Sequence, residues 1–244
     1  MRGLQPGSLR GFLLFIVIVT LAGCATTGGG DTRDPFEGFN RGVYSLNQSL
    51  DKALFDPLGK AYRAITPDVV DRGVTNFFSN LGDIAVVAND LLQLKIDQAL
   101  SDATRFIFNS TIGLLGFFDV SSHIDLPGHD EDFGQTLAFW GVGAGPYLMV
   151  PFFGPTTVRD ATGFVVDAGI LNPVFYIDDD VLKASLLSLN YIDFKADLLS
   201  GKKLLGEAAL DEYEFVKNAY FEKRDKLIND RDTADYSDLE DDGD

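Results

Sequence analysis

The side chains best suited to metal or acid–base chemistry gather just before residue 133. The 244-residue chain has two histidines, His123 and His129, and His129 is followed directly by three acids, Asp130 to Asp132. Such a cluster could hold a cation or act on a lipid ester, with His129 and Asp132 as the best candidates. The H-E-x-x-H spacing of zinc hydrolases is absent, however, and Cys24 is the one thiol. A solvated acidic turn is the favoured interpretation, and we expect no metal site.

Three alternating glycines, Gly141, Gly143 and Gly145, superficially suggest a phosphate-binding loop. A P-loop needs a lysine and then a serine or threonine after its last glycine, and neither follows here. The chain also lacks the G-x-S-x-G turn of serine hydrolases and a dinucleotide fingerprint after a predicted strand. We therefore expect no enzyme activity and no cofactor, and we favour binding or transport.

The same glycines belong to a long uncharged segment. No charged side chain lies between Asp132 and Arg159, which is long enough to cross a bilayer as a helix of about twenty residues. Five glycines and three prolines, Pro146 among them, make one continuous helix impossible. The segment must then be covered by protein, line a wet cavity or form a hairpin held by its neighbours. A buried loop of an ordinary soluble core is the alternative, and Arg159 with Asp160 is expected to end the segment where charge meets water.

The first 23 residues have the pattern of an export signal. Arg2 and Arg10 flank a start that leads into about ten apolar residues, and L-A-G-C then ends at Cys24. This ending resembles the bacterial lipobox, so Cys24 is the expected site of lipidation. Ala25 stands where an aspartate would favour retention at the inner membrane, which favours the outer membrane. Residues 24–33 are small and polar, and we expect a flexible tether.

Composition narrows the partners. The formal net charge of −17 argues against nucleic acid, because phosphate binding needs clustered lysine and arginine. Yet 45% of the residues are hydrophobic, and 20 are phenylalanine. Strong acidity beside abundant aromatic residues indicates a large core or apolar segments that contact lipid.

The first predicted helix begins with a capping-box pattern. Asp34 is the expected N-cap, Pro35 takes the first helical position, and Glu37 completes the box and can pair with Arg41. Asp56 and Pro57 are expected to end this helix. Its polar flank is either a solvated surface or the lining of a polar path, and consists of Asn40, Tyr44, Asn47 and Asp51.

The rest of the chain predicts a mainly α fold in one domain over 34–229. A helical region opens at Thr66, is broken by a polar-aromatic stretch at 76–80, and continues as a segment over 81–94 that is hydrophobic nearly all round. Further helices are expected from Asp97 to near Gly113, over 181–199 and over 207–229. Residues 230–244 are almost all acidic or polar, and we expect a disordered tail.

Six motifs then point to a family. They begin at Asp34 (D-P-F-E-G-F-N-R), Asn76 (N-F-F-S-N-L), Arg105 (R-F-I-F-N-S-T-I-G), Asp132 (D-F-G-Q-T-L), Gly141 (G-V-G-A-G-P-Y-L) and Gly154 (G-P-T-T-V-R-D). Their order resembles the MlaA/VacJ outer-membrane lipoproteins, up to about residue 224. The motif residues include Asp34, Pro35, Glu37, Arg41, Asn76, Asn80, Arg105, Asn109, Arg159 and Asp160. Residues 175–205 match only loosely.

The resemblance implies a helical, ring-like body embedded in the outer membrane beside a trimeric porin. Such proteins provide an amphipathic channel through which misplaced outer-leaflet phospholipids pass to a periplasmic lipid carrier, which feeds an inner-membrane ABC transporter and so maintains lipid asymmetry. On this basis the expected lipid path includes Asn40, Tyr44, Asn47, Asp51, Gly141, Gly143, Gly145 and Pro146. The three glycines are expected to allow close backbone packing at the wall of this path. The remaining alternatives are a lipid-modifying envelope enzyme and a purely structural lipoprotein.

Overall fold

A computed structural model describes residues 31–126 and 128–229. The expected signal peptide (1–23), the lipidation site Cys24, most of the tether and the acidic tail (230–244) lie outside the described residues. Residues 31–33, which the sequence assigned to the tether, already belong to the fold. The carbonyl oxygen of Arg33 accepts from the backbone nitrogen of Tyr147 at 2.8 Å, and its guanidinium lies 4.5 Å from the ring centroid of Phe221.

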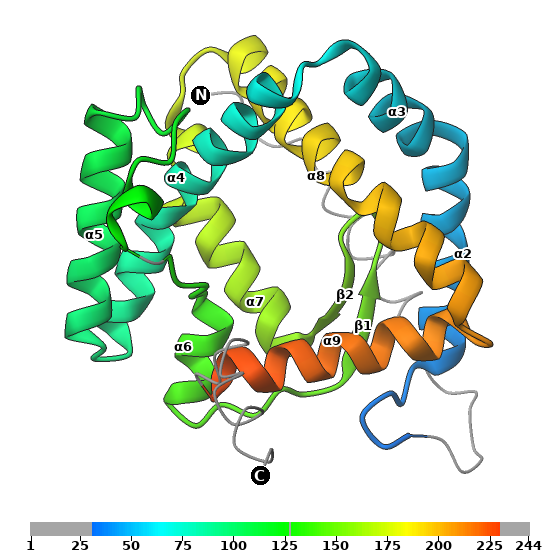
Figure 1. Cartoon of the computed structure of the whole chain (residues 1–244). Coiled ribbons are helices and arrows are strands. Elements are labelled where there is room, and N and C mark those ends of the chain that lie inside the picture. The colour runs from blue at the N-terminus through cyan, green and yellow to red at the C-terminus, as the bar shows by residue number, and fades with distance from the viewer. Residues whose placement is uncertain (1–30, 127, 230–244) are drawn as a thin grey trace, which may run out of the picture.

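The helices are arranged in a ring (Figure 1). α2 (Glu37–Leu50), a π-helical stretch η1 (Asp51–Phe55) and α3 (Asp56–Ile65) form one side, and α4 (Asp68–Leu92) crosses to α5 (Ile96–Thr111) on the opposite side. After α6 (Phe133–Phe139), the hairpin and α7 (Val158–Val166), the chain returns through the long α8 (Asp180–Ala208), and α9 (Glu212–Ile228) closes the ring. The expected mainly α, ring-like single domain is thus confirmed.

The first helix differs from its prediction at both ends. It begins at Glu37 with Phe36 at the N-cap position, and Asp34 makes no cap because its carboxylate is buried among other partners. Nor does it end at Asp56, since the π turn η1 carries the chain directly into α3. Pro57 follows directly after this π turn, as the second residue of α3.

α4 runs without the break expected at 76–80. The side chains of Asn76 and Asn80 leave the helix instead of capping it: their Nδ2 atoms donate to the Phe117 carbonyl oxygen at 3.4 Å and to Ser110 Oγ at 2.9 Å. α5 ends at Thr111, close to the expected end at Gly113, and an irregular turn follows. Leu114, Leu115 and Gly116 all have positive φ in this turn. A short 3₁₀ helix, η2, covers Ser121–Ile124.

The uncharged segment forms a hairpin, one of the three outcomes predicted for it. β1 (Tyr147–Val150) pairs antiparallel with β2 (Gly154–Thr157), with Tyr147 opposite Thr157. Asp132 caps α6 through a 2.8 Å bond from the Gln135 backbone nitrogen. Beyond α7, a π turn η3 (Asp167–Leu171) and a 3₁₀ helix η4 (Pro173–Tyr176) lead to α8, which is longer at its C-terminal end than the predicted 181–199.

The interior of the fold is unusually polar. Its apolar cluster is small, and consists of Val43, Tyr147, Met149 and Tyr213. Among the described residues, buried polar and charged side chains outnumber buried hydrophobic ones. Over the same residues, none of the helices has the length and apolar character needed to cross a bilayer.

Candidate lipid-handling site

Asn40 does not line a path. Its side chain is fully buried, and it takes the place of a neighbouring strand for β1: Nδ2 donates to the Tyr147 carbonyl oxygen at 3.1 Å, and Oδ1 accepts from the Met149 backbone nitrogen at 2.9 Å. Nδ2 also lies 2.8 Å from Asp34 Oδ1. The spacing placed Asn40 on the polar flank, but that flank meets the hairpin, so the prediction for this residue is wrong.

The other residues of that flank are also used for packing. Asn47 donates to the Val150 carbonyl oxygen at 3.0 Å and accepts from the Phe152 backbone nitrogen at 2.9 Å. The hydroxyl of Tyr44 donates to Glu212 at 3.2 Å, which joins α2 to α9. The polar flank of α2 therefore holds the hairpin and the last helix.

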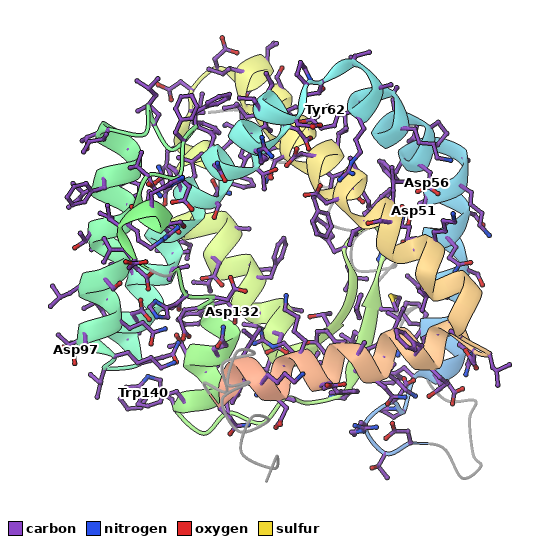
Figure 2. The ribbon with its side chains drawn as sticks, viewed as in Figure 1. Asp51, Asp56, Tyr62, Asp97, Asp132 and Trp140 are labelled. Carbon is purple, nitrogen blue, oxygen red and sulfur yellow. The ribbon has the colours of Figure 1, made fainter. Side chains whose placement is uncertain are left out.

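Asp51 continues this pattern toward α8. Lys195 and Lys202 lie 2.9 Å from its two carboxylate oxygens, and Lys202 also reaches Asp56 at 2.9 Å. Figure 2 shows Asp51 and Asp56 where η1 and α3 run beside α8. Burial would raise the pKa of Asp51, but the hydrogen bonds from the two lysines outweigh it and hold the pKa below its usual value.

Of the three alternating glycines only Gly145 stands in a close approach, since a Cβ atom there would lie 3.2 Å from Val158 Cβ. A Cβ atom at Gly141 or Gly143 would meet nothing within 4 Å, so the prediction that they allow close approach is wrong. Gly141 and Gly145 instead have φ values of 87° and 70°, which a glycine adopts without steric cost. A closer approach occurs in α7, where a Cβ atom on Gly163 would lie 2.3 Å from the backbone nitrogen of Gly134.

Pro146, the remaining residue of the expected path, is half-buried where β1 begins. Its carbonyl oxygen accepts from the Val158 backbone nitrogen at 3.2 Å.

Arg159 and Asp160 do not end the segment at water, because both are buried. Their side chains are 7% and 9% exposed and lie 2.9 Å apart. Arg224 of α9 reaches Asp160 at 3.0 Å and also pairs with Asp132, while the Tyr220 hydroxyl donates to Asp160. This cluster joins the starts of α6 and α7 to the last helix. The expectation failed because the sequence does not show that α9 returns to this point.

Two of the motif residues, Arg105 and Asn109, fasten α5 to the turn that follows it. Asp119 accepts from Asn109 Nδ2 at 3.0 Å and from Arg105 Nη2 at 3.3 Å. Asn109 Oδ1 also accepts from the backbone nitrogen and hydroxyl of Ser121, both at 3.0 Å. Burial would raise the pKa of Asp119, but bonds from Ser122 and Asn109 outweigh it and hold the pKa below its usual value.

The Glu37–Arg41 pair, by contrast, is confirmed. Arg41 Nε lies 2.7 Å from Glu37, and the guanidinium also reaches Asp211 at 2.9 Å and Glu214 at 3.1 Å. The Cζ atom of Arg41 lies 4.4 Å from the centroid of the Tyr213 ring. Arg41 thus ties α2 to the start of α9.

α5 is amphipathic in the inverted sense. It buries Asp102, Arg105 and Asn109, whereas Leu100 and Ile107 are 64% and 58% exposed. A water-soluble helix shows the opposite pattern, with its apolar stripe toward the core. The exposed face therefore suits hydrocarbon.

Exposed apolar residues continue beyond α5. In the turn after α5, Leu114 and Leu115 are exposed, as are Phe139 and Trp140 at the end of α6. Trp140 lies at the outer edge of the ring in Figure 2, and its indole nitrogen donates to the Leu92 carbonyl oxygen at 3.0 Å. A tryptophan with an apolar body and a bonded polar tip is typical of a membrane–water boundary.

α4 also lines a pocket together with α8. This pocket has a volume of about 260 Å³, and its walls combine Phe78 and Phe194 with polar groups from both helices, among them Thr75, Ser79, Asn190, Asp193 and Asp197. Asp193 accepts from the Tyr62 hydroxyl at 2.9 Å and from Thr75 Oγ1 at 3.0 Å. Burial raises its pKa. Apolar and polar groups thus face the same space.

The candidate catalytic residues of the sequence go to different partners. His129 Nδ1 lies 2.7 Å from the buried carboxylate of Asp102, whereas Asp132 caps α6 and pairs with Arg224. Within the described residues, no group of three histidine, cysteine or acidic side chains is suited to a metal. The geometry does not assemble a catalytic site from them.

The MlaA lipoprotein family matches residues 32–227. The chain belongs to this family. It is 35% identical over 227 residues to the intermembrane phospholipid transport system lipoprotein MlaA of Shigella flexneri, covering 91% of this chain and 89% of that protein. The protein of the same name from Escherichia coli K12 is 34% identical with the same coverage. Family membership also confirms the resemblance inferred from the six motifs.

A solved structure agrees with the fold. It comes from work on the "structural basis for maintenance of bacterial outer membrane lipid asymmetry" and aligns with a TM-score of 0.71 at 32% identity. The alignment covers 80% of this chain and 99% of that one. The two chains therefore share their fold.

The sequence did not reveal several residues that matter for the site. Lys217 and the Tyr213 hydroxyl both reach the buried carboxylate of Asp34 from α9, and Arg224 bridges two acids. The sequence predicts a helix over 207–229, but nothing in the sequence shows which residues this helix contacts.

Proposed function

We propose that this chain passes phospholipids misplaced in the outer leaflet of the outer membrane toward the periplasm, and so maintains lipid asymmetry. Membership of the MlaA lipoprotein family over residues 32–227 supports the transport role. The observation that carries the mechanism is the inverted α5, which exposes Leu100 and Ile107 while it buries Asp102 and Arg105. Such a helix places the outside of the ring in hydrocarbon and leaves polar groups inside.

A phospholipid needs apolar surface for its tails and a hydrated or polar surface for its head. The pocket between α4 and α8 offers both, with Phe78 and Phe194 beside Thr75 and Asn190. These residues replace Asn40 in the proposed lipid path, because Asn40 is buried in the packing of β1. The lipid can move down its own gradient or toward a tighter carrier, so no nucleotide site is needed.

The anchoring and the partners belong to the same proposal. Acylation at Cys24 would hold the protein on the periplasmic side of the outer membrane. Beside a trimeric porin, the ring would receive lipid from the membrane and release it to a periplasmic carrier that feeds an inner-membrane ABC transporter. The names of the relatives, which describe an intermembrane phospholipid transport system, support this order.

The enzyme alternative is not favoured, since the family consists of lipid-transport lipoproteins. A purely structural lipoprotein remains the competing role. The two differ in what the protein carries: a transporter should co-purify with phospholipid after gentle detergent extraction, and mass spectrometry would detect it.

The decisive experiment removes the chain from its own bacterium and labels the outer-leaflet phospholipid of intact cells. We expect the label to rise, and to return to its normal level when the full chain is restored. A Cys24→Ser chain, which cannot be acylated, should fail to restore it. Unchanged labelling after removal of the chain would refute the transport role.

A further inference from the structure

The described residues form a second pocket, whose lining shares no residue with the pocket between α4 and α8. It has a volume of about 540 Å³ and lies between the start of α4 and the turn after α5. Its lining includes Val69, Arg72, Phe117, Phe118 and His123. Pockets that bind small ligands have volumes of about 300–1,000 Å³, so this one is large enough for a headgroup and the start of its chains.

Arg72 places a positively charged guanidinium in the lining of this pocket. Its side chain is exposed, and within residues 31–126 and 128–229 it forms no ion pair or hydrogen bond. In a chain of net charge −17 with many paired arginines, a guanidinium left open in a pocket is suited to an external anion.

The one carboxylate in the lining does not oppose such an anion strongly. Asp119 already accepts hydrogen bonds from Asn109, Ser122 and Arg105. His123 Nδ1 donates to the Asp119 carbonyl oxygen at 2.9 Å, which leaves its Nε2 without a partner among the described residues. Arg72 and His123 can therefore approach the same anion from two sides of the pocket.

Apart from Asn76, whose amide donates to the Phe117 carbonyl oxygen, the rest of the wall is apolar and firmly placed. The ring of Phe117 fills the space beside Gly73 so closely that a Cβ atom there would lie 2.2 Å from it. Phe118 packs against Phe117 at 5.2 Å between ring centroids and remains 46% exposed, and Val69 is 57% exposed. A free inorganic ion gains nothing from these side chains, whereas an amphiphile does.

We propose that this pocket binds the phosphate of a phospholipid headgroup, with Arg72 as the main anion contact, His123 as a second, and Val69 and Phe118 against the glycerol and first methylenes. The proposal rests on the phospholipid-transport function and adds a second, peripheral lipid site to the α4–α8 pocket. It commits to the lipid rather than to free phosphate because the wall around the cation is apolar.

The test uses the full-length protein in a neutral detergent and calorimetric titration with three probes: dihexanoyl phosphatidylglycerol, dihexanoylglycerol and inorganic phosphate. Arg72→Gln should weaken phosphatidylglycerol binding about tenfold, the usual worth of a hydrogen bond to a charged group. Binding of dihexanoylglycerol should not change, and Arg72→Lys should restore part of the affinity. Lys223→Gln, which removes an exposed charge on α9, should bind like the wild type.

Equal phosphatidylglycerol affinity in Arg72→Gln and wild type would overturn the proposal. So would inorganic phosphate that displaces the lipid at low concentration, because the pocket would then be a free-phosphate site. Circular dichroism should confirm that both variants fold, as expected for an exposed side chain without partners. These outcomes are independent of the cell-labelling experiment. If Arg72→Gln leaves lipid affinity unchanged, only the pocket proposal fails. If removal of the chain leaves outer-leaflet phospholipid unchanged, the transport function fails.

Discussion

The side chain of Asn40 in α2 bonds to the backbone of β1 at two points. Its Oδ1 accepts from the Met149 backbone nitrogen at 2.9 Å, and its Nδ2 donates to the Tyr147 carbonyl oxygen at 3.1 Å. A two-stranded hairpin is marginal by itself, because one edge of each strand lacks a partner. The amide of Asn40 supplies that partner for β1. The hairpin therefore depends on a side chain more than a hundred residues away in the sequence.

Asn40→Ala should lower the free energy of unfolding by about 2–4 kcal/mol, because it leaves a buried carbonyl and a buried N–H of β1 without partners. Chemical denaturation in detergent, followed by circular dichroism, would measure the loss. Ser45→Ala, an exposed position on the same helix, is the matched control and should change stability by less than about 0.5 kcal/mol. Equal stability of the two variants would contradict the role assigned to Asn40.

One added methyl group should have different effects on stability at Gly163 of α7 and at Gly143 of the uncharged segment. Gly163→Ala should destabilise the fold by about 1–3 kcal/mol, since its Cβ atom would meet the Gly134 backbone at 2.3 Å and backbone moves less easily than a side chain. Gly143→Ala has open space and should be close to neutral. Thermal unfolding of the two variants side by side would check this. A larger loss in Gly143→Ala would refute the assignment.

This pair also shows where sequence reasoning succeeds and fails. Glycines and prolines between Asp132 and Arg159 correctly excluded one helix, because their backbone preferences are local and are written in the sequence. Which glycine permits close packing is not local: Gly163 matters because α7 lies against α6, and no pattern in the chain shows that contact. The sequence analysis assigned close packing to the glycines at 141–145, whereas the closest approach involves Gly134 and Gly163.

The polar flank of α2 also shows that local spacing is predictable from the sequence while tertiary contacts are not. Its helical spacing was right, and the Glu37–Arg41 pair followed from it. Spacing gives a face but not what covers the face, so Asn40 and Asn47 were assigned to a lipid path although they bond to the hairpin backbone. The ring shape was predicted because six motifs in order identified the family, and periodicity alone would have given only a mainly α fold.

The pH dependence of stability should carry the signature of Asp90. Its side chain is fully buried, and neither carboxylate oxygen has a partner among the described residues. Burial, with the charges of Asp102 and Glu131, raises the pKa of Asp90 to about 7, against which Lys95 acts only weakly. The folded state then holds a proton that the unfolded chain releases above about pH 3.8, so this group's contribution to stability falls as pH rises from about 4 to 7.

Asp90→Asn removes the ionisable group, and with it this pH-dependent contribution to the free energy of unfolding. Relative to the wild type, the variant should gain up to about 1.4 kcal/mol per pH unit across that window and should be clearly more stable at pH 8. Denaturation curves at several pH values would measure the difference. Asp97→Asn, at an exposed position near the start of α5, is the control and should follow the wild-type curve. A variant that ran parallel to the wild type would show that Asp90 is already ionised in the fold.

The inverted face of α5 gives the sharpest test of membrane embedding. Leu100→Asp with Ile107→Asp places two charges on side chains that are 64% and 58% exposed, so the fold should remain while the contact with hydrocarbon is lost. A charged carboxylate in the hydrocarbon core costs on the order of 2.5–3.5 kcal/mol. We therefore expect the double variant to float with vesicles far less than the wild type, with unchanged circular dichroism.

Lys223→Asp changes the net charge by the same two units at an exposed position on α9, and it should keep the wild-type association with vesicles. This comparison separates a local cost in the bilayer from general repulsion by an acidic protein. Both chains must carry the same N-terminus, because acylation at Cys24 alone would hold either protein on the membrane. Equal flotation of non-acylated Lys223→Asp and Leu100→Asp/Ile107→Asp chains would show that α5 faces water or a protein partner, and the lipid-facing side of the ring would have to be sought on another helix.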